Sequence, residues 1–338
     1  MDGEKMLKKI LVLFVAFVFI AGCPSEGEED EKNIWAENGA EEEEAGTQDY
    51  LDIQEGSSSQ AASGTGGNGG ETDAVPAIEY SEEVNENLFI YFINVGYGDT
   101  QGDAILVKKG DFDMVIDGGP ETEKHEVVNF LFEKGVDDIE VLVSTHEDPE
   151  HKGGLEYIEE NFRIGEVWRP AEGSAGYGQM LESLGAENGV KYMGRGDERT
   201  FNGVRVLVRN PLLGNERFFD SDNDAIVLRL EDRGFCTLLT SDIDGSAQTQ
   251  ILMDSEPCEV VQMPWHGMSE GLSSLDFFFD KLKPEAVIIS GSSKDWTNTR
   301  QTVFNKAELR DIEVYPNYEG ESAKVTFNGN EYAITIEG

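Results

Sequence analysis

The placement of bulky apolar residues decides which parts of this 338-residue chain can form a hydrophobic core. A twelve-residue apolar run, Ile10–Ala21, stands near the N-terminus, and dispersed apolar segments begin only at residue 88. Between them, residues 24–86 hold 19 acidic residues, one basic residue and a Gly/Ser-rich stretch. Low hydrophobicity with high net charge is typical of disorder. We therefore expect a disordered acidic tether over residues 24–86 and one folded domain over residues 87–338.

The N-terminal segment has the pattern of a secretory signal. Lys8 and Lys9 precede the apolar run, which ends at Gly22-Cys23. The run is too short to span a bilayer comfortably. Residues 20–23 resemble a lipobox, in which the cysteine is lipidated. We expect residues 1–23 to be a lipoprotein signal peptide and Cys23 to anchor an extracytoplasmic protein to the lipid bilayer; an ordinary signal with an incidental cysteine is the alternative.

Charge and cysteine content exclude several classes of protein. The formal net charge is −42, and residues 87–338 alone hold 47 acidic and 22 basic residues. Such a chain has no strongly basic surface for nucleic acid, so contact with phosphate would need a local basic patch or a bound metal. Three cysteines exclude a disulfide-built mini-domain. Cys236 and Cys258 are expected to be small buried residues, with a disulfide as the alternative that export would permit.

Apolar runs of strand character alternate with helix-like stretches after residue 87, which predicts an α/β domain. Two sheets packed face to face with helices outside would bury both kinds of element. The expected strands are Leu88–Val95, Ala104–Val107, Met114–Ile116, Ile139–Val143, Val204–Val208, Ala225–Leu230, Phe235–Thr240, Val260–Met263, Ala286–Ile289, Val325–Phe327 and Tyr332–Ile336. The expected helices are Glu123–Glu133, Gly154–Glu160, Gln179–Leu184, Gly245–Met253, Leu272–Leu282 and Arg300–Leu309.

Four potential metal ligands follow one strand directly. His146, Asp148, Glu150 and His151 lie within six residues, after the apolar run 141–143, in a chain with only four histidines. Imidazole and carboxylate groups that converge in a turn are the ligands that divalent metals require. A polar surface loop is the alternative, since acidic residues are abundant here. His125, at the start of a helical pattern, is expected to be an exposed surface residue.

Other strand ends carry matching groups. Asp117 precedes two glycines at the end of one apolar run, Asp242 follows another, and His266 follows a third. Acidic and imidazole groups at several strand ends indicate a shared active-site edge. Asp117 has a structural alternative, in which its carboxylate bonds backbone N–H groups of a tight turn.

These motifs occur in an order that resembles the metallo-β-lactamase superfamily, with the carboxyl-terminal domain of the competence protein ComEC as the closest branch. The motifs are Asn94-Val95-Gly96, Gln101-Gly102-Asp103-Ala104, Ile116-Asp117-Gly118-Gly119, Thr145–Gly154, Leu239-Thr240-Ser241-Asp242 and Trp265-His266-Gly267. The resemblance implies a four-layer αββα sandwich of two mixed sheets flanked by helices, with one or two divalent ions, zinc or manganese, at one edge. It also implies metal-dependent hydrolysis, with a phosphodiesterase or nuclease activity as the first expectation.

The resemblance also implies roles for individual residues. His146 and Asp148 would hold a first ion, Glu150 and His151 a second, with Asp242 bridging and His266 closing the second site. These roles make Asp242, Asp148 and His151 the expected catalytic residues.

Three departures from the family pattern qualify these roles. The family's mid-chain histidine is missing, and Asn223-Asp224 is the nearest matching position, so Asn223 is expected to support the first site. Trp265 replaces the first histidine of an H-H-G motif, which leaves open whether His266 is a ligand. The stretch Trp296–Thr299 lacks a further histidine.

Two other functions remain open. Loss of ligand histidines is compatible with a catalytically degenerate binding protein that keeps the fold, and a hydrolase of small surface phosphoesters is equally compatible with the motifs. The substrate would accordingly be DNA or a small phosphoester. The aromatic runs Phe218-Phe219 and Phe277–Phe279 are expected to face the core or a sheet rather than to stack on bases.

Overall fold

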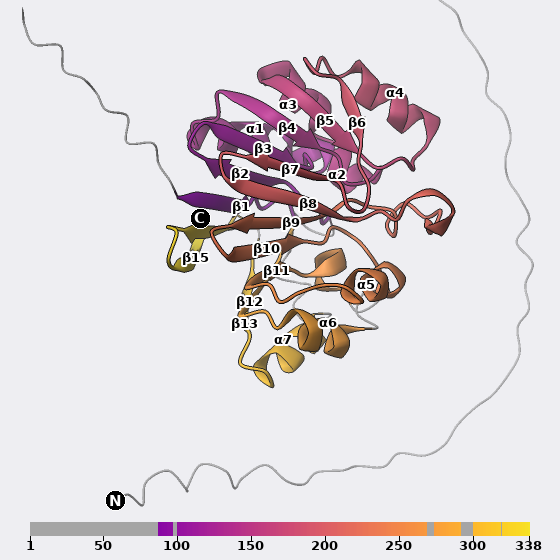
Figure 1. Ribbon diagram of the computed structural model, residues 1–338. Coiled ribbons are helices and arrows are strands. Elements are labelled where there is room, and N and C mark those ends of the chain that lie inside the picture. Colours follow the sequence, from indigo (N-terminus) through magenta and orange to yellow (C-terminus); the bar gives the residue numbers. More distant parts are fainter. Residues whose placement is uncertain (1–86, 97–99, 269–273, 292–299, 319) are drawn as a thin grey trace, which may run out of the picture. The chain divides into compact units, whose positions relative to one another are not determined.

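The computed structural model of the protein describes residues 87–96, 100–268, 274–291, 300–318 and 320–338. The predicted signal peptide with Cys23, the tether, and Trp296–Thr299 lie outside the described residues. The described residues form four layers, in which two sheets pack face to face and helices cover both outer surfaces (Figure 1). The expected αββα sandwich is confirmed. Within the described ranges, no helix is both long and apolar enough to cross a membrane.

The first sheet has eight strands in the order β15-β14-β1-β2-β3-β4-β5-β6. Strands β3 to β6 pair in parallel, and the remaining neighbours are antiparallel, so the sheet is mixed. Its strands are β1 Leu88–Phe92, β2 Ile105–Lys109, β3 Phe112–Ile116, β4 Asp138–Val143, β5 Arg163–Arg169, β6 Val190–Tyr192, β14 Ser322–Phe327 and β15 Tyr332–Glu337.

The second sheet has seven strands in the order β13-β12-β11-β10-β9-β8-β7 and is parallel from β10 to β13. Its strands are β7 Glu198–Phe201, β8 Val204–Asn210, β9 Val227–Asp232, β10 Phe235–Leu239, β11 Val260–Gln262, β12 Ala286–Ile289 and β13 Glu313–Pro316. Because parallel strands end at the same edge of a sheet, the loops after β10, β11 and β12 gather there.

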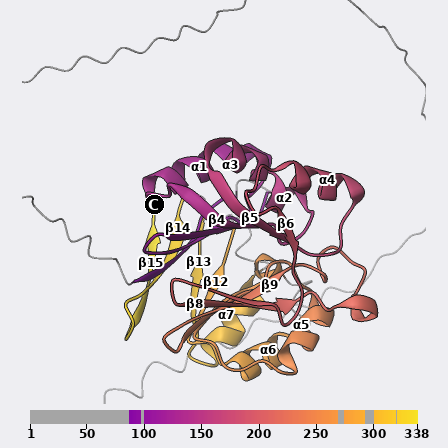
Figure 2. The same cartoon turned by 45° about the horizontal axis from the view of Figure 1, so that its top comes forward.

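Helices cover the outer faces of the two sheets separately. In Figure 2, α1, α3 and α4 lie over the first sheet, and α5, α6 and α7 lie against the second. The helices are α1 Lys124–Glu133, α2 Pro149–Lys152, α3 Leu155–Asn161, α4 Ala175–Ser183, α5 Gly245–Leu252, α6 Leu275–Leu282 and α7 Gln301–Glu308, with short 3-10 turns η1 Glu121–Glu123, η2 Gly214–Glu216 and η3 Pro264–Gly267. The buried residues of α6 recur at i, i+3, i+4 and i+7, the spacing of one helix face.

Three hydrophobic clusters hold the four layers together. One cluster lies between the sheets and includes Phe92 and Leu228, and the other two lie under the outer helices, around Leu131 and around Phe278. Burial of apolar area supplies the main stabilising term at each of these interfaces. The same packing fixes the sheet edge from which the polar loops project.

The structure contains four strands that the sequence pattern did not predict. Strands β6 and β7 have only three and four residues, none of them buried, so they carry little apolar signal. The apolar residues of β5 are interrupted by Gly165, and β13 lies at a sheet edge. All four form because neighbouring strands offer them a backbone to pair with, which is a tertiary effect.

Aromatic residues also differ from expectation. Phe278 and Phe279 are buried and Phe218 is half-buried, as predicted. Phe219, however, is 63% exposed, and Phe277 is 43% exposed. Phe277 lies on the solvent side of α6, whereas Phe219 lies in the loop between β8 and β9 that leads to Asp222.

A disulfide joins Cys236 of β10 to Cys258, just before β11, although a pair of free buried thiols was the default expectation. The two residues are 22 positions apart. Closing a loop of this length in the unfolded chain corresponds to a stabilisation of about 3 kcal/mol.

We therefore expect the double variant Cys236→Ala/Cys258→Ala to lower the free energy of unfolding by about 3 kcal/mol, measured by urea denaturation without reductant. Adding a thiol reductant should destabilise the wild-type protein by a similar amount and leave the variant unchanged. Equal stability of oxidised and reduced wild-type protein would contradict this expectation.

Candidate metal centre

Polar side chains from both sheets meet at the edge where the parallel strands end. Asp117 follows β3, His146 follows β4, and His151 lies on the short helix α2. Asp242 follows β10 of the second sheet, and His266 lies on η3, directly after β11. All five side chains are buried.

An inner cluster consists of Asp103, His151, Asp242 and His266, whose potential ligand atoms all lie within 4.8 Å of one another. Asp242 is at its centre. One carboxylate oxygen, Oδ2, lies 3.2 Å from His151 Nε2, and the other, Oδ1, lies 3.4 Å from His266 Nε2. Asp242 thus connects a histidine of the first sheet's loops to a histidine of the second sheet's loops.

An outer cluster consists of His146, Asp148 and Asp222. His146 is buried, whereas both carboxylates are half-buried and reach solvent. The ring centroids of His146 and His151 are 4.2 Å apart, so the outer cluster adjoins the inner one. The two clusters together form one elongated site that opens on the side of Asp148 and Asp222.

Several buried polar atoms in this site lack a hydrogen-bond partner among the described residues. They are His146 Nε2, His266 Nε2, Asp103 Oδ1 and Asp242 Oδ1. A buried polar atom without a partner destabilises a fold by about 1–3 kcal/mol. Imidazole nitrogens and carboxylate oxygens are ligands of zinc and manganese, and divalent ions would satisfy the two imidazole nitrogens and the Asp242 oxygen. The residues present therefore fit one or two divalent metal ions.

Asp117 orients the site from behind. Its carboxylate accepts hydrogen bonds from Thr145 N at 2.8 Å and Thr145 Oγ1 at 2.6 Å, and it lies 2.9 Å from His151 Nδ1. If His151 donates its Nδ1–H to Asp117, the Nε2 lone pair is left facing Asp242. A carboxylate behind a histidine is the usual way in which proteins fix the orientation of such a ligand.

The ionisable groups strongly perturb one another. Burial disfavours the charged imidazolium of His151, but the carboxylates of Asp242 and Asp117 outweigh it and raise the pKa of His151 well above its usual value. Burial likewise opposes ionisation of Asp242, yet the imidazoles of His266 and His151 lower the pKa of that carboxyl well below its usual range. Burial lowers the pKa of His146 to about 4, so this imidazole is neutral at pH 7. Without an ion, the inner cluster therefore holds a protonated His151 against an ionised Asp242.

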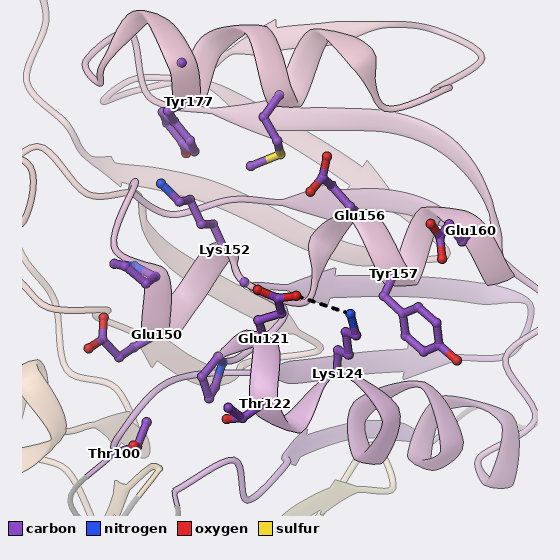
Figure 3. Close-up of a pocket in the computed structure, with 15 residues that line it drawn as sticks. Thr100, Glu121, Thr122, Lys124, Glu150, Lys152, Glu156, Tyr157, Glu160 and Tyr177 are labelled. Atoms are coloured by element: carbon purple, nitrogen blue, oxygen red, sulfur yellow. Dashed lines mark hydrogen bonds and ion pairs between the residues drawn. The ribbon is translucent and has the colours of Figure 1, made fainter. Parts of the chain in front are cut away.

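Glu150 joins neither cluster, contrary to the role that the family resemblance implied. Successive residues of a helix point about 100° apart, so α2 can bury His151 while Glu150 faces elsewhere. Glu150 lines a cavity of about 660 Å³ on the other side of α2, together with Lys152, Thr100 and Tyr177 (Figure 3). The cavity carries both acidic and basic side chains, and Lys124 is paired with Glu121 there.

Asn223 also lies outside the two clusters. Its Oδ1 accepts hydrogen bonds from the backbone N–H groups of Asp244 and Ala247, at the start of α5, so it supports the loop after Asp242. The preceding residue, Asp222, lies beside His146 and Asp148 instead. Sequence reasoning missed Asp222 because neither spacing nor apolar pattern distinguishes it from the neighbouring acidic residues.

His266 is buried in the inner cluster, whereas Trp265 is half-buried, so the second position of the Trp265-His266-Gly267 motif supplies the imidazole. Asp103 belongs to one of the family motifs but had no predicted role. His125 is exposed, and its ring contacts Tyr157 edge-on at 4.6 Å.

Residues 97–233 match the family model of the metallo-beta-lactamase superfamily. That segment is similar to a metallo-beta-lactamase superfamily domain. Metal-dependent hydrolases characterise this superfamily. The matched segment includes both clusters' residues up to Asp222, whereas Asp242 and His266 follow it.

Two kinds of relative resemble the chain. ComE operon protein 3 of Bacillus subtilis (strain 168) is 24% identical over 198 residues, which cover 56% of this chain and 24% of the relative, so the match spans about a quarter of that protein's own length. Among solved structures, a mutant of the CmlA β-hydroxylase has a TM-score of 0.50 at 13% identity, over 72% of this chain and 54% of that one, which shows a shared fold. The metallo-beta-lactamase fold protein YhfI from Bacillus subtilis has a TM-score of 0.48 at 11% identity, over 70% of this chain and 99% of its own.

The ionisation of the site predicts how metal binding depends on pH. Ligands must be deprotonated to bind an ion, and the pKa of His151 is raised, so binding should displace its proton. Burial, and then the charges of Asp148 and Asp242, raise the pKa of Asp222 to about 7, so a further proton is displaced from Asp222 near neutrality. We expect the affinity for Co²⁺ or Mn²⁺ to rise by about tenfold per pH unit for each displaced proton between pH 6 and 8.

Isothermal calorimetry in buffers with different ionisation enthalpies would count the protons released. Asp222→Asn should lower that number near pH 7. Asp113→Asn should not, because the pKa of Asp113 is also raised to about 7 but this residue lies at the start of β3, outside both clusters. Metal binding that is independent of pH over this range would refute the proposed ligand set.

Proposed function

We propose that this protein is an extracytoplasmic, metal-dependent phosphodiesterase. The observation that carries this proposal is the pair of adjoining His/Asp clusters, in which buried nitrogen and oxygen atoms without hydrogen-bond partners face one another. A bound divalent ion would lower the pKa of water and would neutralise the negative charge of a phosphate group. The proposed ligands are His151, Asp242 and His266 for one ion, and His146, Asp148 and Asp222 for the other.

The protein's own residues would each contribute a defined property. Asp242 is ionised and faces both inner imidazoles, so it is suited to be the central ligand. His146 is neutral at pH 7 and presents a free Nε2 toward Asp148, 3.9 Å away. Asp148 and Asp222 are half-buried, so they lie on the side of the site from which a substrate would approach.

The acidic surface favours a substrate that is bound through the metal centre rather than through a basic groove. Residues 87–338 carry more than twice as many acidic as basic residues, so phosphate would be repelled elsewhere. Phe219 offers an exposed ring three residues before Asp222, with the Arg217 guanidinium 4.9 Å from the ring centroid. An aromatic face can stack on a planar group of the substrate regardless of charge. This favours a nucleotidyl or aryl diester, and the partial likeness to ComE operon protein 3 makes DNA in a competence-related process the first candidate.

Two alternatives are separable by experiment. A catalytically degenerate binding protein was suggested by the missing histidine, but the outer cluster keeps three potential ligands because Asp222 lies beside His146 and Asp148. A hydrolase of small surface phosphoesters would share the same site and differ only in substrate. Turnover of single- and double-stranded DNA and of a small aryl diester, each with added manganese or zinc, distinguishes these functions.

Substitution of Asp242 should remove activity. Because Asp242 faces both inner histidines, Asp242→Ala should lower phosphodiester hydrolysis by more than ~100-fold. Loss of a residue that only contacts a metal ligand typically costs about 10- to 100-fold. His151→Ala should have an effect similar to that of Asp242→Ala. Asn223→Ala should cost less, since its amide bonds the backbone of α5.

His125→Ala is the matched control, because this histidine is exposed and lies in neither cluster, and it should keep full activity. Folding of each variant is checked by circular dichroism, since a buried charge left without its partner can unfold a domain. Activity that survives Asp242→Ala in a folded, metal-depleted sample would end the proposed mechanism.

We propose further that Cys23 anchors the protein to the outer face of a membrane, because Ile20–Cys23 follow a basic and then an apolar segment. Cys23→Ser should prevent lipidation, so in cell fractionation the protein should move from the membrane to the soluble extracytoplasmic fraction or remain as uncleaved precursor. Unchanged membrane association with normal signal cleavage would argue against the lipid anchor.

A further inference from the structure

The two imidazoles of the inner cluster face carboxylates on both of their sides. Asp242 lies on the Nε2 side, at 3.2 and 3.4 Å from His151 and His266. Asp103 lies on the Nδ1 side, with Oδ2 3.9 Å from His151 Nδ1 and Oδ1 3.8 Å from His266 Nδ1. Asp103 is therefore better placed to act on the two rings from behind than to share an ion with their Nε2 atoms.

The Nδ1 positions already have closer partners. His151 Nδ1 lies 2.9 Å from Asp117, and His266 Nδ1 lies 3.1 Å from the backbone carbonyl of Ser290. Those acceptors favour an Nδ1–H on both rings, so that Nε2, on the side of Asp242, is the atom of each ring that would bind an ion. The negative charge of Asp103 then lies beside two N–H groups and favours the same tautomer of both histidines.

Gln262, the last residue of β11, holds Asp103 in this position. Its Nε2 donates to Asp103 Oδ2 at 2.7 Å and to Ser290 Oγ at 2.9 Å. Its Oε1 accepts from the backbone N–H groups of Thr240 at 2.9 Å and Ser241 at 3.3 Å. One fully bonded amide thus connects Asp103 to the segment that leads into Asp242 and to the residue whose carbonyl contacts His266.

The backbone around Asp103 is confined as well. A Cβ atom on Gly102 would come within 2.2 Å of the Glu150 carbonyl oxygen, on α2 beside His151. A Cβ on Gly291, which follows Ser290, would come within 1.9 Å of the Gly102 carbonyl oxygen. The segment that carries Asp103 is therefore confined between α2, which bears His151, and the residues after β12, where the Ser290 carbonyl contacts His266.

From this arrangement we infer that Asp103 and Gln262 form a positioning pair, which aligns a histidine from each sheet onto one metal ion. Most of the contact between the sheets is apolar, and apolar packing does not fix the direction of a side chain. The Asp103–Gln262 hydrogen bond supplies that direction across the two layers. The inference rests on the proposed function only in requiring a metal at the inner cluster, whatever the substrate.

The test is the affinity of the full-length protein for Co²⁺, measured by chelator competition, together with the visible absorption spectrum of the bound ion. Gln262→Leu removes the amide at similar size, and Gln262→Glu sets a carboxylate against Asp103. Each should weaken Co²⁺ binding by ~10- to 100-fold, as loss of a residue that orients a metal ligand does, and should change the spectrum.

A reciprocal exchange tests the hydrogen bond itself. In the double variant Asp103→Asn/Gln262→Glu, the amide and the carboxylate trade places and the pair keeps its charge. The carboxylate introduced at position 262 can still accept from the backbone N–H groups of Thr240 and Ser241. This variant should regain at least part of the affinity that Gln262→Glu loses. A purely structural role for Gln262 predicts no such recovery.

Asn317→Leu is the matched control, because Asn317 is another buried amide that joins the layers, through a bond from its Nδ2 to the Phe92 carbonyl at 3.0 Å. It should lower stability in urea and leave Co²⁺ affinity and spectrum unchanged. Where Gln262→Leu fails to fold, the nearly isosteric Asp103→Asn gives the same test.

The inference is overturned if Gln262→Leu or Asp103→Asn binds Co²⁺ with wild-type affinity and spectrum, or if the double variant is as weak as Gln262→Glu. Failure of the proposed function would give a different result. The wild-type protein itself would then bind no Co²⁺, or would bind it without hydrolysing any phosphodiester.

Discussion

The carboxylate of Asp242 is held between two imidazoles that come from opposite sheets, His151 at 3.2 Å and His266 at 3.4 Å. This contact requires that the two sheets stack with one particular offset, since β10 delivers Asp242 and the loop after β4 delivers the helix that bears His151. Three features fix that offset: the apolar layer between the sheets, the close backbone approach at Gly102 and Gly291, and the hydrogen bonds of Gln262. The packing of the core therefore also determines the geometry of the site in this protein.

Much of the fold could be predicted from the sequence because burial leaves a periodic trace. Strands with continuous apolar runs, such as β4 and β10, and helices with an apolar face, such as α6, were predicted within a few residues. The short strands β6 and β7 were not, because exposed residues at a sheet's edge carry no such trace. Their pairing depends on neighbours that are distant in sequence.

The site was predictable to the extent that its residues follow strands. His146, His151, Asp242 and His266 each lie shortly after an apolar run, and the structure brings them to one edge. Glu150 was assigned to the site by position in a motif, but the helical turn of α2 directs it away from the clusters. Asp222 and Asp103 lie in loops where the direction of a side chain depends on long-range hydrogen bonds. No local pattern reveals Asp222, and the motif that contains Asp103 gives that residue no role. Sequence spacing thus identifies which loops meet, whereas three-dimensional contacts decide which side chains within them converge.

The unequal burial of the two clusters has a kinetic consequence. All four residues of the inner cluster are buried, while two of the three in the outer cluster reach solvent. An ion that enters from solvent meets Asp148 and Asp222 first, and an ion at the inner cluster must pass them again to leave. Exchange at the inner position would therefore be slower than exchange at the outer one. The protein would load its ions in sequence, and a chelator would strip them in the reverse order.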